Sequence, residues 1–135
     1  MKLSFEDLFS NEQTLATAAQ ANNSTNTLDF KSNGDDIDHL LRWFLLITNA
    51  PATSAGATLT VTWQTSANNS DWTTLWTSET FAAASLTDGA YVIKRQPLPA
   101  GLLRYNKLVF TTGTGAWSTA PIVTAAIVQN DEPVE

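Results

Sequence analysis

One stretch of the sequence decides the fold class: Thr58-Leu59-Thr60-Val61-Thr62-Trp63-Gln64-Thr65. Apolar Leu59, Val61 and Trp63 alternate with polar residues, and in an extended chain successive side chains point to opposite faces of a sheet. The alternation therefore predicts a half-buried antiparallel strand with these three side chains turned inward.

The segments around this strand also favour strands over helices. Residues 40–48 form the longest apolar run, and because both parities of the run are apolar it predicts a strand covered on both faces, by the opposite sheet and by something else. Residues 72–78 alternate as well. Shorter strands are expected around residues 27–30, 81–85, 91–94, 105–111 and 122–128. About eight strands, with turn signals about every 8 to 12 residues, predict an antiparallel sandwich or barrel.

The composition fits one domain and excludes several classes of function. The chain has 135 residues and no cysteine, which excludes disulfides, thiolate zinc sites and cysteine nucleophiles. Its 13 acidic residues against 7 Lys and Arg give a net charge of −6, the wrong sign for binding nucleic acid. No apolar run has the length of a membrane span, and Glu6 and Asp7 interrupt the apolar core that a signal peptide needs. We expect no nucleic-acid partner and no membrane partner.

The sequence offers little for catalysis. Its single histidine, His39, stands at the start of a predicted strand, and no nucleophile motif accompanies it. Asp35, Asp36 and Asp38 lie beside it, but their spacing matches no calcium-binding loop, so a solvated acidic turn is the simpler interpretation. We predict a protein that is not an enzyme, with no catalytic residue, no cofactor and no metal ion.

Tryptophan is abundant, with 5 residues, and three of them stand out. Trp72 and Trp76 flank Thr74 on one face of a predicted strand, and Trp117 follows the glycine-rich turn at residues 113–115. Aromatic side chains in a sandwich usually point into the core. An exposed set would instead form a platform for a sugar ring or for another protein. Both interpretations are open for these three rings.

Five pieces of the chain, taken in their order and spacing, carry a resemblance to a known family: residues 8–13, 26–29, 56–66, 98–105 and 122–128. Together they resemble the jelly-roll capsid cement, or decoration, proteins of tailed bacteriophages. The resemblance implies an all-β fold, an antiparallel jelly-roll-like sandwich of about eight strands. It also implies an amino-terminal arm at residues 1–20 and a sandwich domain at residues 21–135.

A mechanism without catalysis follows from this resemblance. A protein that binds only the assembled shell stabilises it by mass action, and one that touches two or three capsomers at once gains from effective concentration. The expected partners are the major capsid protein of the same phage and further copies of this chain, in a dimer or a trimer. The expected location is the outer surface of the virion capsid, after synthesis in the cytoplasm of the bacterial host.

Contact with the shell or with a sister subunit is expected at apolar anchors in the arm and at tryptophans of the sandwich: Phe5, Leu8, Phe9, Trp43, Trp72, Trp76 and Trp117. The alternative function is a carbohydrate-binding β-sandwich module that uses exposed Trp72, Trp76 or Trp117. The two hypotheses make different demands on the structure. Sugar binding needs coplanar rings exposed in a groove, whereas a cement protein needs an apolar surface that packs on protein.

Overall fold

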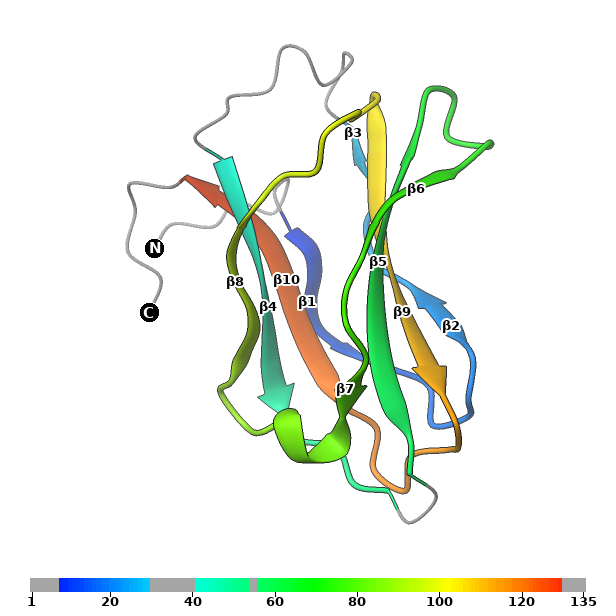
Figure 1. Cartoon of the computed structure of the whole chain (residues 1–135), viewed down its shortest axis with the longest axis vertical. Helices are drawn as coiled ribbons and strands as arrows, with labels where there is room; N and C mark the ends of the chain where they lie inside the picture. The colour runs from blue at the N-terminus through cyan, green and yellow to red at the C-terminus, as the bar shows by residue number, and fades with distance from the viewer. Residues whose placement is uncertain (1–7, 30–40, 54–55, 130–135) are drawn as a thin grey trace.

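Two antiparallel sheets packed face to face make up the fold (Figure 1). The computed structural model describes residues 8–29, 41–53 and 56–129. Within these residues there is no α-helix, and therefore no helix with the length and apolar character needed to cross a membrane. The elements are β1 (Leu8–Thr14), β2 (Ala21–Asn23), β3 (Leu28–Asp29), β4 (Leu41–Asn49), β5 (Thr58–Ser66), β6 (Thr73–Thr77), β7 (Phe81–Ala82), the 3-10 turn η3 (Ala83–Ser85), β8 (Tyr91–Pro97), β9 (Tyr105–Gly113) and β10 (Ile122–Gln129).

The order of the strands in the two sheets identifies a jelly roll. Sheet A has the order β1-β10-β4-β8, and sheet B has the order β2-β9-β5-β6, with β3 paired to β9 and β7 paired to β5. If the two-residue strands β3 and β7 are set aside and the others are numbered along the chain, these orders become 1-8-3-6 and 2-7-4-5. Most connections therefore pass from one sheet to the other in interlocking Greek keys. The predicted fold class is confirmed.

The interior between the sheets is built around β5. Its three apolar side chains point inward and are fully buried, as the alternation predicts, while the threonines between them face away. Trp63 lies at the centre of an aromatic cluster: its ring centroid is 5.0 Å from that of Phe9 and 5.3 Å from that of Trp43, and both pairs meet edge to face. The indole N–H of Trp63 donates to Asn106 Oδ1 at 3.0 Å, so its buried polar atom is satisfied.

The predicted arm at residues 1–20 overlaps β1, which belongs to sheet A. This strand pairs with β10, and Phe9 and Leu15 are buried between the sheets. The register of β1 against β10 shifts twice, and Glu12 has a φ of 52°. Such bulges remove the alternation by which a sequence reveals a strand. The sandwich therefore includes β1, and only residues 1–7 of the predicted arm lie outside the described residues.

Candidate functional site

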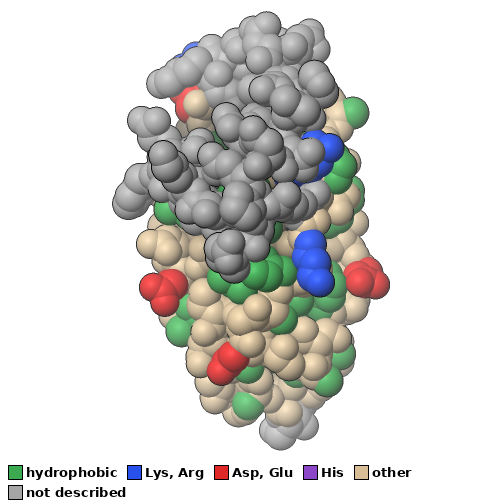
Figure 2. Space-filling model, turned by 90° about the vertical axis from the view of Figure 1, so that its left-hand side faces the viewer, with side chains coloured by type: hydrophobic (Ala, Val, Ile, Leu, Met, Phe, Trp, Pro, Cys, Tyr) green, Lys and Arg blue, Asp and Glu red, His purple; other side chains and the backbone are tan. Residues whose placement is uncertain are grey.

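The outer face of sheet A, which is turned away from the interior, is apolar. On β4, alternate side chains from Trp43 to Ile47 fill the interior, so Phe44 and Leu46 point outward. They belong to a second apolar cluster, called the outer cluster below, which consists of buried Leu8, Phe44, Ala126 and Val128 with half-buried Leu46 and Tyr91. Figure 2 looks at this face and shows hydrophobic side chains gathered near its middle. Sheet A is therefore apolar on both faces, as the run at residues 40–48 predicts.

Packing within the outer cluster joins all four strands of sheet A. The rings of Phe44 on β4 and Tyr91 on β8 meet edge to face, with 5.6 Å between their centroids. Leu8 on β1 lies opposite Ala126 on β10. Phe44 is only 1% exposed, and burial of a side chain of this size contributes about 1.5–3 kcal/mol. The cluster is thus a second, smaller core on the outside of the sandwich.

The outer face of sheet B is polar at the equivalent positions. Thr58, Thr60 and Thr62 of β5 alternate with its buried apolar residues and are half-buried. Lys107 of the neighbouring strand β9 lies with its ammonium 4.5 Å from the centroid of the Trp72 ring. Hydroxyl groups can bond to water where they stand, so these positions of β5 need no protein to cover them.

One ion pair holds β3 to the start of β9. Arg104 donates two hydrogen bonds to Asp29, from Nε to Oδ1 at 2.7 Å and from Nη2 to Oδ2 at 2.9 Å. This hydrogen bonding to Asp29 raises the pKa of the Arg104 guanidinium. The guanidinium carbon also lies 4.9 Å from the centroid of the Tyr105 ring. Both charges are engaged with each other, and we assign the pair a positioning role in the sheet.

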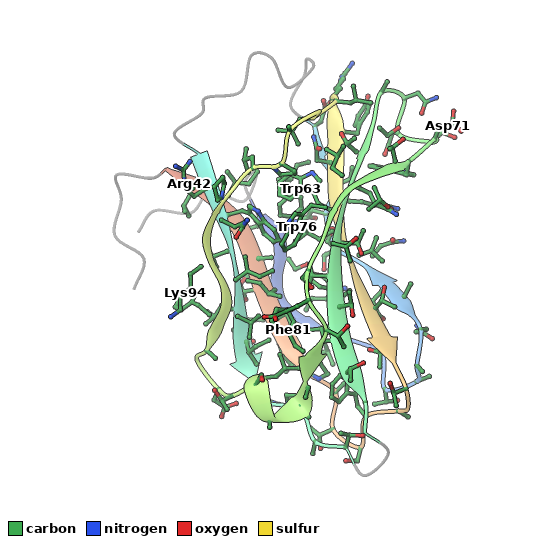
Figure 3. All side chains as sticks on the ribbon, viewed as in Figure 1. Arg42, Trp63, Asp71, Trp76, Phe81 and Lys94 are labelled. Carbon is green, nitrogen blue, oxygen red and sulfur yellow. The ribbon has the colours of Figure 1, made fainter. Side chains whose placement is uncertain are left out.

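A groove with a volume of about 390 Å³ lies at the side of the sandwich where β6 and β7 of sheet B approach β8 of sheet A. Its apolar lining consists of Trp76, Phe81, Val92 and Ile93, and its polar lining consists of Thr77, Ser78, Glu79, Lys94 and Gln96. Figure 3 shows Trp76 and Phe81 on the side of sheet B and Lys94 on the side of β8. The sequence gives no sign of this groove, because it depends on how two edge strands from different sheets approach each other.

A protein-family comparison matches residues 9–127 of the chain, which run from β1 to β10 and therefore include both sheets. The chain belongs to the Bbp16 family. No curated protein matches the chain. The Bbp16 match contains the outer cluster except Leu8 and Val128, the threonine-lined face and the whole groove.

The three tryptophans singled out in the sequence of this Bbp16-family protein do not form one platform. Trp117 is 3% exposed, and its indole N–H donates to Thr112 Oγ1 at 3.0 Å. Trp76 is half-buried and meets Trp43 edge to face, with 5.3 Å between the ring centroids. Trp72 lies beside the outer face of sheet B. These three rings therefore do not offer the coplanar, exposed surface on which a sugar would stack.

The residues predicted to contact a shell or a sister subunit fall into separate places in the Bbp16 fold. Phe9, Trp43 and Trp117 are buried between the sheets, so in this conformation they leave almost no surface for a partner. The other four are Leu8, which is buried in the outer cluster, Trp72 and Trp76, which are half-buried, and Phe5, which lies outside the described residues. Contact by these four stays a prediction.

The acidic turn is also outside the described part of this Bbp16-family chain, since Asp35, Asp36, Asp38 and His39 all fall within residues 30–40. Among the residues that are described, no three His, Asp or Glu side chains gather in a way that could hold a metal ion. In the same part of the chain, one buried side-chain polar atom has no hydrogen-bond partner, the indole nitrogen of Trp43. It lies in the aromatic cluster around Trp63.

Proposed function

We propose that this Bbp16-family protein is a virion structural protein, a capsid cement or decoration protein that binds the outer surface of an assembled phage shell and stabilises joints between capsomers without catalysis. One observation carries the proposal. Sheet A is apolar on its inner and its outer face, whereas the outer face of sheet B is lined with threonine. This asymmetry suits a molecule that turns one face to protein and the other to water.

Selective binding is sufficient for the mechanism. A molecule that binds the assembled shell and not free capsomers shifts the equilibrium toward the shell by mass action. When it touches two or three capsomers at once, the second contact forms at a high effective concentration and adds to the first. The partner in this proposal is the major capsid protein. The net charge of −6 supports a position on the outer side of the shell, away from packaged nucleic acid.

Self-association belongs to the same proposal, as a dimer or a trimer. The repeated sites on a shell are symmetric, so a symmetric oligomer meets them with identical contacts. Half-buried Leu46 and Tyr91 stand at the border of the outer cluster, and they are the members through which apolar packing continues into another protein.

Shell stability tests this function. Shells of the phage that encodes the protein are assembled without it, and the purified protein is added back in increasing amounts. We expect the temperature of shell disruption to rise with the added protein and to reach a plateau when the sites are full. Equal disruption temperatures with and without the protein contradict the proposal.

A matched pair of variants locates the contact. Leu46→Asp places a carboxylate on the outer face of sheet A, and we expect shell binding to weaken because the charge would have to be buried. Thr62→Asp places the same charge on the outer face of sheet B and should leave shell binding unchanged. Thermal melting of each free variant confirms that both are folded before binding is compared.

A further inference from the structure

We infer that the groove between β6 and β8 binds residues 1–7 of a second copy of this chain, as an extended segment added along β8. The inference rests on the self-association included in the proposed function, and it names the segment and the surface that meet. Four features support it: the unpaired strand edges, the apolar lining of the groove, the pattern of residues 1–7, and the distance between β1 and β8.

The strands that border the groove are edge strands. In the described part of the chain, β8 pairs with β4 alone, and β6 pairs with β5 alone. The outer edge of such a strand presents backbone N–H and C=O groups that can bond to one further strand. A peptide that adds to a sheet edge uses these groups for affinity and places alternate side chains in pockets beside the edge.

The shape of β8 brings two apolar side chains to the groove, whose lining is otherwise mixed. The register between β8 and β4 shifts twice, so β8 carries extra residues relative to its partner. As a result Val92 and Ile93, which are neighbours in the sequence, both pack against the core. With Trp76 and Phe81 from the other sheet they form the apolar floor of the groove. Trp76 and Val92 are half-buried, so they are the side chains on which apolar residues of an added strand would pack.

Residues 1–7 have the pattern that this groove requires. Apolar residues occupy positions 1, 3 and 5 and polar residues occupy positions 2, 4, 6 and 7: Met1-Lys2-Leu3-Ser4-Phe5-Glu6-Asp7. In an extended segment Leu3 and Phe5 would point to the same side, toward the floor. The segment carries a base near one end and two acids near the other.

The exposed rim of the groove carries one charge of each sign to complement this segment, Glu79 and Lys94. Neither side chain makes an ion pair with another described residue. Opposite charges across a contact fix the register of a bound segment more than they add to its affinity. We therefore expect Glu6 to meet Lys94.

The two edges of sheet A are too far apart for residues 1–7 of the same chain to reach the groove, so we assign the segment to a second copy. β1 and β8 lie at opposite edges, with β10 and β4 between them. Three strand spacings of about 4.8 Å make about 14 Å, which takes up at least about four extended residues. Phe5 would then still be crossing its own sheet and could not reach its own groove. The segment of a neighbouring copy has no such sheet to cross.

Self-association of the full chain is the measurement that tests the inference. Sedimentation of the purified protein over a range of concentrations gives the dissociation constant of the oligomer. We expect Phe5→Asp to weaken association at least about tenfold, because a charge replaces the main apolar anchor. Hydrogen exchange at the β8 amides should become slower at oligomer-forming concentrations in the wild type and not in this variant.

A charge exchange tests the register of the segment. Lys94→Glu should weaken association by about two- to fivefold, and adding Glu6→Lys to that variant should restore it. Lys107→Glu is the matched control: it makes the same change on the outer face of sheet B and should leave association unchanged. Lys94 is exposed, so its replacement is not expected to affect folding.

Three outcomes overturn the inference: a wild-type protein that is monomeric at every concentration, association that is insensitive to Phe5→Asp, or a Lys94→Glu defect that Glu6→Lys does not restore. The proposed function fails independently. If the purified protein associates through the groove but does not raise the disruption temperature of the shells, the inference stands and the cement function is wrong.

Discussion

The outer faces of the two sheets are built from similar antiparallel strands, but the outward side chains are apolar on β4 and β10 of sheet A and polar on β5 of sheet B. On sheet A, the outward positions of β4 and β10 carry Phe44, Ala126 and Val128, all buried. On sheet B, the outward positions of β5 carry threonines that keep contact with water, such as Thr60 and Thr62. A strand needs only one apolar face to hold a two-sheet sandwich together. The second apolar face of sheet A therefore serves packing outside the sandwich interior.

β1 links the two environments of sheet A, and its removal should have the largest effect. Leu8 belongs to the outer cluster and Phe9 to the interior. Deletion of residues 1–10 removes both, and we expect a loss of more than about 5 kcal/mol, close to the whole stability of a small domain. Deletion of residues 1–7 is the control and should leave the melting temperature nearly unchanged at concentrations where the wild type is monomeric. A stable, cooperative fold after the longer deletion would show that β1 is dispensable.

A substitution in the interior between the sheets gives the loss of unfolding free energy against which substitutions on the two outer faces are compared. Trp63→Ala should destabilise the protein by about 3 to 5 kcal/mol, because the indole is fully buried among Phe9 and Trp43. Urea denaturation of the variant and the wild type measures the difference. A loss below about 1 kcal/mol would mean that the inward face of β5 has been assigned the wrong way round.

The outer cluster should behave as a core of lesser strength. For Phe44→Ala we expect a loss of about 3 kcal/mol, at the lower end of the range for a buried phenylalanine. The same denaturation experiment measures it. If Phe44→Ala costs no more than a typical surface substitution, the outer cluster does not stabilise the subunit and the contrast between the two faces disappears.

The threonine-lined face should be nearly neutral. Thr62→Ala changes a half-buried outward position of β5, and we expect a change within about 0.5 kcal/mol. Chemical denaturation, with the wild type measured in parallel, checks this value. A loss comparable to that of Phe44→Ala would show that sheet B is also covered on its outer face.

The sequence predicts best the features that depend on which side chains of one strand alternate between its two faces. Leu59, Val61 and Trp63 alternate without interruption, and the structure buries all three. The run at residues 40–48 predicts two covered faces for the same reason, since apolar side chains at both parities leave no face for water.

Features that depend on bulges or on contacts between distant strands could not be predicted in this way. The bulges around Glu12 hide β1, because a single extra residue reverses the parity of all that follow. Trp117 lies outside the strands, and it takes the fold to show that it points inward, through its burial and its hydrogen bond to Thr112. The groove requires Val92 and Trp76 to come from edges of different sheets, and their spacing in the sequence contains no sign of this.

The pairing of β1 with β10 has a mechanical consequence. Leu8 lies opposite Ala126 and Thr14 lies opposite Ile122, so the first described residue and the end of the last strand leave the sheet at the same end of an antiparallel pair. A pulling force applied through these ends would load the β1–β10 backbone hydrogen bonds one at a time, starting with the pair nearest Leu8. A force that enters through the face of sheet A is instead shared by all four strands at once. We therefore expect the fold to resist a force applied to the face of sheet A better than the same force applied to the ends of β1 and β10.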